Sequence, residues 1–246
     1  MTPPVQPCVE ADTGRKLPVL YQDRWLCAID KPCGLLVHKS SRGDDRVFAL
    51  QRLRDQLGCR VWPLHRLDRA TSGVLLFALD ADTAAAVGHQ FMARSVAKRY
   101  LAVTRGHTDT EGRIDKALAR GDQRDDQPAR TDYTRLATLE LPIAVGRYAS
   151  ARYSLVAVFP RTGRTHQIRR HFKHIFHPLI GDTTYGEGRH NRLFRTHFGC
   201  HRLLLHAAEL ELHHPWTHQR LRIRAPLRGV FARVEALFAD QDRAIA

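Results

Sequence analysis

The chain has 246 residues, of which 43% are hydrophobic, and it carries 39 Lys and Arg residues against 25 Asp and Glu residues. This length and apolar content predict a sizeable folded core, arranged as one large domain or two small ones. The longest apolar runs, such as VLLFAL at 74–79, are far shorter than the roughly 20 residues of a membrane span, and no basic segment leads into an apolar secretion signal.

The formal net charge of +14 points to an anionic partner. Most of the cations are arginines, whose planar fork suits phosphate and stacks on bases, so the composition favours nucleic acid as the partner. An arginine excess can also reflect genome base composition. The five cysteines form no C-x-x-C pair. They indicate reduced thiols and a cytoplasmic protein, and they argue against a disulfide framework or a cysteine-rich zinc site.

The hydrophobic pattern predicts alternating strands and helices without a regular βαβ rhythm. In the first part of the chain it predicts strands at 17–21 and 25–30, a helix at 47–58, strands at 61–65 and 74–79, a helix at 81–95 and a strand at 97–106. After an exposed polar loop at 120–132 it predicts strands at 133–140 and 151–159, a helix at 165–176, strands at 203–212 and 220–224, and a closing helix from 227.

These elements indicate an α+β fold with a mainly antiparallel sheet. We find no internal repeat, low-complexity linker or clear domain break. The sequence therefore predicts a flexible lead-in at 1–16 followed by a single domain at 17–240.

Two kinds of site are disfavoured by their patterns. His171, His174 and His177 have helical spacing, but no H-E-x-x-H-like pattern supplies further ligands, so we interpret them as surface or RNA-facing histidines and predict no metal site. There is no G-x-S-x-G elbow and no glycine-rich phosphate loop.

The helix at 165–176 contains an arginine that needs an anion. Thr165 is a plausible N-cap, and an apolar stripe of Ile168, Phe172, Ile175 and Phe176 should face the core. Arg169 lies at the edge of this stripe, so its guanidinium should be partly desolvated and should need a carboxylate as its partner.

Asp68 is the candidate partner, because it lies alone among arginines in PLHRLDRATSG, between two strand-like segments. On pattern alone, an Arg169–Asp68 pair could equally be an inert buried ion pair or part of a site.

Several motifs resemble those of the RluA-type pseudouridine synthases, and together they cover nearly the whole chain. HRLDRATSGVLLFA is similar to the family's signature segment, YQDRWLCAIDKPCGLLVH to its opening strands with K-P-x-G, and AKRYLAV to its K-x-Y motif. RTGRTHQIRRHFKHIFHPLIGDTTYG resembles its G-R-x-H-Q-[IL]-R and G-D-x-x-Y-G segments, and RLLLHA another block. The resemblance implies a pseudouridine synthase fold, in which a mainly antiparallel mixed sheet is flanked by helices and a central cleft binds RNA.

The resemblance also implies the chemistry. It makes Asp68 the catalytic residue that acts at the ribose of a target uridine, Arg169 the cation that keeps Asp68 ionised, and Tyr100 a residue that stacks on the base and assists proton transfer. Arg66 would occupy the gap left by the flipped-out uridine, and Leu205 would pack against the base. The uracil would detach, rotate and rejoin through C5, an isomerisation for which no cofactor is expected.

Two segments are most similar to the branch of the family that modifies uridine 65 of tRNA. They are GEGRHNRLFRTHFGCHRLLLHA and HIFHPLIGD. The early first strand leaves no room for an S4-type RNA-binding domain. The extra lead-in and Thr184-Tyr185 depart from that branch. The expected protein is therefore a monomeric tRNA-modifying isomerase that needs no membrane or metal. A ribosomal-RNA stem-loop is the alternative substrate, and a silent RNA-binding or folding factor on the same fold is the alternative function.

Overall fold

The computed structural model describes residues 16–38, 47–119 and 126–244, with side chains as far as residue 239. This part of the chain divides into two compact units. Unit 1 comprises the described residues up to Ala97 together with Ala207–Pro226, and unit 2 comprises Lys98–His206 and the described residues from Leu227 on. The predicted lead-in at 1–16 lies outside the described residues except for Lys16.

Unit 1 is built on antiparallel strands. The strand order is β1-β2-β4-β11, with β3 paired to β4 and β12 paired to β11. The strands of this unit are β1 (Val19–Gln22), β2 (Leu26–Lys31), β3 (Trp62–Pro63), β4 (Ser72–Ala78), β11 (Leu205–His213, in this unit from Ala207 on) and β12 (Arg220–Arg224). Its helices are α1 (Ala49–Leu57) and α2 (Ala81–Met92).

The core of unit 1 explains the unbroken apolar runs within its central strands, at 26–29 in β2 and 74–78 in β4. Every residue of β2 and β4 is buried, and strands that are covered on both faces lose the alternation of apolar and polar residues. Val87 of α2 packs into the same cluster as Leu26 and Leu76. Helix α1 ends, as the sequence predicts, at Gly58, whose φ of 68° is left-handed and suits glycine.

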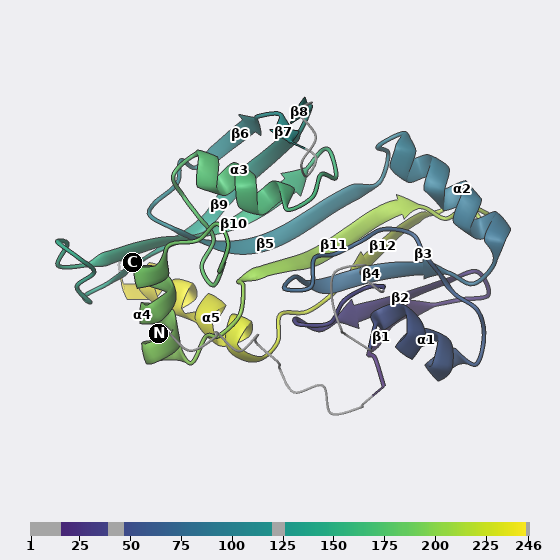
Figure 1. Ribbon diagram of the computed structural model, residues 1–246, viewed down its shortest axis with the longest axis horizontal. Helices are drawn as coiled ribbons and strands as arrows, with labels where there is room; N and C mark the ends of the chain where they lie inside the picture. The colour runs from purple at the N-terminus through teal and green to yellow at the C-terminus, as the bar shows by residue number, and fades with distance from the viewer. Residues whose placement is uncertain (1–15, 39–46, 120–125, 245–246) are drawn as a thin grey trace. The chain divides into compact units, whose positions relative to one another are not determined.

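Unit 2 contains the antiparallel order β5-β10-β9-β6 and a small separate hairpin, β7-β8. Its strands are β5 (Ala97–Arg105), β6 (Glu111–Asp115), β7 (Leu118–Ala119), β8 (Asp126–Gln127), β9 (Arg130–Leu141) and β10 (Ala151–Pro160). Its helices are α3 (Gln167–His174), α4 (Gly188–Phe198) and α5 (Gly229–Ala244). Figure 1 shows α3 over β9 and β10, and α4 beside α5.

The core of unit 2 joins α4 and α5 to the strands. Phe194 of α4, Phe231 and Phe238 of α5, and Tyr153 of β10 are all essentially inaccessible to solvent and belong to one cluster. The hydroxyl of Tyr153 is 2.9 Å from Nδ1 of His190, which gives this buried phenol a polar partner.

The predicted elements of unit 2 differ from the structure in several places. The loop predicted at 120–132 is wrong for its last residues, because β8 and the beginning of β9 lie there; residues 120–125 lie outside the described part. Strands β6 and β7 and helix α4 were not predicted. Helix α3 begins after His166 rather than Thr165, because the side chain of Gln167 closes the preceding turn by accepting hydrogen bonds from Thr162 Oγ1 and Arg164 N.

Two side chains of the α3 segment also differ from expectation. His171 is buried, not at the surface: its Nδ1 is 2.9 Å from Thr131 Oγ1 and its Nε2 is 2.9 Å from the Lys116 carbonyl oxygen. Burial is the main reason that the pKa of His171 is lowered. Phe176 does not face the core, because it follows the end of the helix with a φ of 63° and is 79% exposed.

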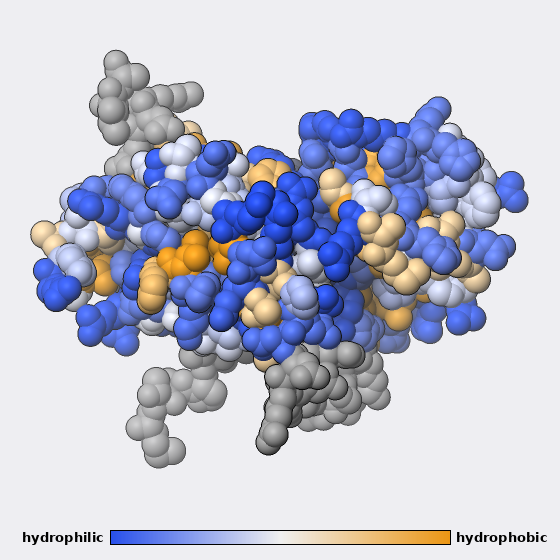
Figure 2. All heavy atoms as spheres, turned by 90° about the horizontal axis from the view of Figure 1, so that it is seen from above, coloured by the Kyte–Doolittle hydropathy of each residue, from blue (hydrophilic) through white to orange (hydrophobic). Residues whose placement is uncertain are grey.

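None of the helices in the described ranges has the length and apolar character needed to cross a membrane. The face of the molecule in Figure 2 is mainly hydrophilic, with apolar residues in small groups. That one domain spans 17–240 stays a prediction.

Candidate active site

Asp68 lies in the loop between β3 and β4, within unit 1. It is partly exposed, between the buried Leu67 and the exposed Arg69. The carbonyl oxygen of Asp68 accepts a hydrogen bond of 3.0 Å from Thr71 N, which closes a turn immediately before β4. The carboxylate is therefore carried on a short turn next to a fully buried strand.

A second turn, at residues 31–35, fixes this loop through its main chain. Gly34 N donates to the Arg69 carbonyl oxygen at 2.8 Å, and Arg69 Nε donates back to the Gly34 carbonyl oxygen at 3.0 Å. Cys33 Sγ lies 3.2 Å from the Ala70 carbonyl oxygen. The K-P-x-G segment thus contacts the two residues that follow Asp68.

Lys31 holds the same two segments together from inside the unit. Its side chain is fully buried, and Nζ donates to the carbonyl oxygens of Pro32 and Leu35 at 2.8 Å each and of Arg69 at 3.3 Å. A buried ammonium is costly unless it is hydrogen-bonded, so these carbonyl groups are part of what makes its burial possible. Lys31 therefore links the end of β2 to the loop of Asp68.

Arg169 lies on α3, within unit 2, and is held by a buried carboxylate. Its Nε donates to Asp182 Oδ2 at 2.7 Å and its Nη2 donates to Asp182 Oδ1 at 2.8 Å; the two side chains are 8% and 0% exposed. Burial alone would raise the pKa of Asp182, but the hydrogen bonds from Arg169 and from the Tyr185 and Thr184 N–H groups hold that pKa below its ordinary value. The expectation that Arg169 binds a carboxylate is confirmed with Asp182, and its pairing with Asp68 stays a prediction.

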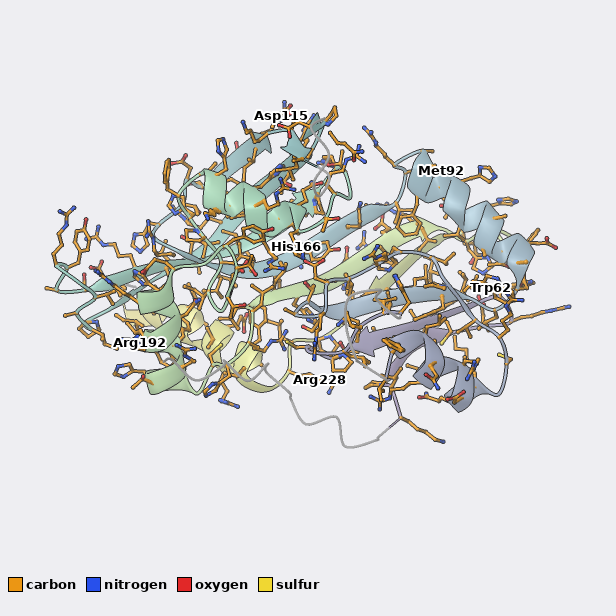
Figure 3. The ribbon with its side chains drawn as sticks, in the orientation of Figure 1. Trp62, Met92, Asp115, His166, Arg192 and Arg228 are labelled. Atoms are coloured by element: carbon orange, nitrogen blue, oxygen red, sulfur yellow. The ribbon has the colours of Figure 1, made fainter. Side chains whose placement is uncertain are left out.

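An aromatic ring covers the same guanidinium. The centre of the Tyr185 ring is 5.0 Å from Cζ of Arg169, a distance at which the π face attracts the cation. The Tyr185 hydroxyl is 3.1 Å from Nδ1 of His166, the residue that precedes α3 and is labelled in Figure 3. Arg169 therefore has a carboxylate at the edge of its fork and a ring over its face.

The loop that carries Asp182 and Tyr185 is held by hydrogen bonds from α4 and by close packing. Asn191 Nδ2 donates to the Asp182 carbonyl oxygen, and Asn191 Oδ1 accepts from Gly181 N, each at 2.8 Å. Gly186 has no room for a side chain, because a Cβ there would overlap the main chain of Asp182. Helix α4, which provides Asn191, thus fixes the carboxylate that orients Arg169.

The other predicted site residues occupy varied positions. Tyr100 is a partly exposed residue of β5, opposite Val158 of β10. Arg66 is exposed in the loop of Asp68, and Leu205 is buried at the beginning of β11. Their roles stay predictions.

Asp182, Tyr185 and Lys31 are the functional candidates that reasoning from the sequence missed. All three were visible in the quoted motifs, in G-D-x-x-Y-G and K-P-x-G. Helical periodicity showed that Arg169 needs an anion, but it carries no information about a partner that lies beyond the helix end.

The chain matches a family model described as RNA pseudouridylate synthase over residues 26–174. This match contains both Asp68 and Arg169. The chain belongs to the RNA pseudouridylate synthase family.

Individual relatives support this assignment over most of the chain. It is 46% identical over 238 residues to the tRNA pseudouridine synthase C of Vibrio cholerae, covering 92% of this chain and 97% of that protein. It is 48% identical over 221 residues to the protein of the same name from Pasteurella multocida, covering 85% and 90%. For the Pectobacterium carotovorum subsp. carotovorum protein the identity is 47% over 229 residues, covering 87% of this chain but 61% of that protein.

The fold of the chain is similar to that of two solved structures. Human RNA Pseudouridylate Synthase Domain Containing 1 gives a TM-score of 0.68 at 28% identity, covering 90% of this chain and 94% of that chain. Human RNA Pseudouridylate Synthase Domain Containing 4 gives 0.69 at 26% identity, covering 89% and 92%. The predicted α+β pseudouridine synthase fold is thereby confirmed.

Proposed function

We propose that this protein converts uridine to pseudouridine in tRNA, at position 65, and that it acts in the cytoplasm as a monomer. The similarity to three bacterial proteins named tRNA pseudouridine synthase C, over 85–92% of the chain, is the observation that carries the choice of tRNA. The branch-specific segments around HIFHPLIGD and the sequence of α4 support position 65.

The chemistry requires a carboxylate at the ribose. Asp68 acts at the ribose of the flipped-out uridine, by attack at C1′ or by taking the proton from C2′, and the uracil detaches. The base then rotates and rejoins the sugar through C5, where the C5 proton is lost. The N1–C1′ bond is replaced by a C5–C1′ bond, and N1 gains a proton as C5 loses one, so the reaction balances without a co-reactant.

Arg169 provides the electrostatic part. A cation next to a carboxylate favours its ionised form, and the bidentate bond to Asp182 uses Nε and one N–H of Nη2. We assign Asp68 as a further carboxylate that this guanidinium faces, as the resemblance to the family implies. This arrangement would keep Asp68 charged and oriented toward the sugar.

The remaining residues handle the base. Tyr100 stacks on the uracil and assists proton transfer, and Leu205 packs against it. The target base must leave its helical stack to be reached. Arg66, exposed two residues before Asp68, fills the gap, because a guanidinium can stack on neighbouring bases and also contact phosphate.

Release of tritium from 5-tritiated uridine in tRNA transcripts tests the proposal, because the C5 label leaves only when the new C–C bond forms. We expect release from tRNA that disappears when uridine 65 is replaced. Asp68→Asn should lower the rate at least about a thousandfold while tRNA binding is retained, because the amide keeps the shape of the carboxylate.

The alternatives give different results in the same assay. Release only from a ribosomal-RNA fragment would keep the isomerase and change the substrate. Tight RNA binding without release from either RNA would identify a binding factor. Normal turnover by Asp68→Asn would remove the catalytic assignment.

A further inference from the structure

Three arginines of unit 2 gather around one carboxylate. Asp132, on β9, accepts from Arg161 Nε at 2.8 Å, and from Arg130 Nε and Nη2 at 3.2 Å each. Arg113 Nε, on β6, is 3.4 Å from Asp132 Oδ1. We call Arg113, Arg130 and Arg161, with Asp132, the Asp132 arginine cluster.

The cluster is cationic and exposed. The arginine side chains of residues 113, 130 and 161 are 61%, 38% and 59% exposed, whereas Asp132 is 20% exposed. Burial would raise the pKa of Asp132, but the hydrogen bonds from Arg130 and Arg161 outweigh it and lower that pKa. Among the described residues, the cluster therefore has three positive charges and one negative charge, and its arginine side chains are exposed to solvent.

The backbone fixes the positions of these charges. Arg113 is opposite Asp132 in the β6–β9 register, and Arg161 N donates to the Arg130 carbonyl oxygen at 2.9 Å. Asp115, labelled in Figure 3, ends β6 opposite Arg130, and Lys116 follows it in the chain. Arginine forks held in place by a shared carboxylate lose little freedom when they bind phosphate oxygens.

Gln167 connects the cluster to the helix of Arg169. Its buried side chain donates to the Arg130 carbonyl oxygen and to Thr131 Oγ1 at 3.0 Å each. The same side chain accepts from Arg164 N at 3.0 Å. Arg169 follows Gln167 by two residues, so the cluster and the proposed catalytic arginine belong to one hydrogen-bonded framework.

A second arginine group, in unit 1, provides a contrast. Arg220, Arg222 and Arg224 of β12 are 66%, 46% and 67% exposed, comparable to the Asp132 cluster. Two carboxylates of β11 pair with them: Glu211 with Arg220 and Arg222, and Glu209 with Arg224. Three arginines here meet two negative charges, so this group has half the excess charge of the Asp132 cluster.

We propose that the Asp132 arginine cluster is a phosphate-binding surface that grips the backbone of the RNA substrate next to the segment that carries Arg169. The inference rests on the proposed function for its ligand. It deepens that function by assigning part of the binding energy to β6, β9 and the 161–164 turn. Phosphate contacts set the register of an RNA and carry no sequence information, so they contribute affinity rather than the choice of uridine.

The test compares two triple variants of the full chain by direct binding to a tRNA transcript at several salt concentrations. We expect Arg113→Gln, Arg130→Gln and Arg161→Gln together to raise Kd at least tenfold, and to lower the slope of log K against log salt by about 2. The matched control replaces Arg220, Arg222 and Arg224 by Gln and should change Kd less than about twofold. An unchanged Kd for the first variant, or equal losses for both, overturns the proposal.

A third variant separates charge from folding. Replacing Arg113, Arg130 and Arg161 by Lys keeps the charge, so most of the salt dependence should return. Loss of binding as severe as in the Gln variant, together with a lowered Tm in both, would show a structural role and overturn the proposal. Tritium release is measured separately. Absence of release from the wild type overturns the proposed function, whereas the binding comparison still tests whether the cluster binds phosphate.

Discussion

The two residues proposed to share the chemistry are held in different ways. The loop of Asp68 is fixed through its main chain, where Lys31 Nζ and Gly34 N both donate to the Arg69 carbonyl oxygen. Arg169 is fixed at the guanidinium itself, between the carboxylate of Asp182 and the ring of Tyr185.

The difference follows from side-chain length. An aspartate has two rotatable side-chain bonds, so a rigid turn nearly determines where its carboxylate lies. An arginine has four and carries about 2 kcal/mol of rotamer entropy, so a rigid helix does not position its head. We infer that Arg169 depends on side-chain partners and Asp68 on its backbone.

Removing the carboxylate that holds Arg169 should have the largest effect. Asp182→Asn leaves a buried guanidinium without its counter-charge, and we expect the free energy of unfolding to fall by about 3 kcal/mol. Urea titration at pH 7 measures this loss. Glu211→Gln, which removes a carboxylate from arginines that are 46% or more exposed, is the control and should change stability little.

The pH dependence of the same variant provides a second measurement. Because the pKa of Asp182 is lowered in the folded protein, its stabilising contribution is complete above its unfolded pKa of about 4 and is lost as the pH falls below that value. The stability gap between wild type and Asp182→Asn should therefore narrow below about pH 4. A gap that stays constant between pH 7 and pH 3 contradicts the assigned role.

Removing the Lys31 ammonium, which binds main-chain carbonyl groups around the loop of Asp68, should have an intermediate effect. Lys31→Met keeps the length of the buried chain but leaves the carbonyl groups of Pro32, Leu35 and Arg69 without this donor, at a cost of about 2 kcal/mol. We expect kcat to fall with it, since the turn after Asp68 loosens. Lys16→Met, at an exposed lysine, is the control. If Lys31→Met has the stability and kcat of the wild type, the main chain holds the loop without the Lys31 side chain.

Removing the aromatic ring that covers Arg169 should have the smallest effect, and this effect should be specific to kcat. Tyr185→Leu removes a cation–π contact worth about 1 kcal/mol, so kcat should fall about fivefold to tenfold with little change in KM. Tyr185→Phe keeps the ring, loses only the contact with His166, and should recover most of the activity.

Tyr148→Leu is the matched control, because Arg147 lies 5.1 Å from that ring at an exposed site. It should leave kcat unchanged. Equal activity of Tyr185→Leu and wild type would show that Asp182 alone positions the guanidinium.

Much of the fold could be predicted because its signals are local. The continuous apolar run of β4, the glycine stop after α1 and the alternating residues of β12 each follow from neighbouring residues. Strand β6 is short and mostly exposed, and α4 is rich in arginine and histidine. Neither has a hydrophobic pattern strong enough to be recognised alone.

The candidate site also contains one feature that local sequence signals predict and others that they do not. The requirement of Arg169 for an anion could be predicted, because helical periodicity shows which side chains approach the core. The choice of Asp182 could not, since the partner lies in an irregular loop whose position is set by Asn191 of α4. His171 was misplaced for a related reason: its acceptor, the carbonyl of Lys116, follows a strand that was not recognised.

The charged strand β12 has a consequence for how the protein behaves at high concentration. Among the described strands, β12 is hydrogen-bonded to β11 alone, although β1 also lies close to it. Arg220, Arg222 and Arg224 recur at every second residue, and a neighbouring copy that added its own β12 would bring like charges into register. The arginines therefore act against self-association through this strand.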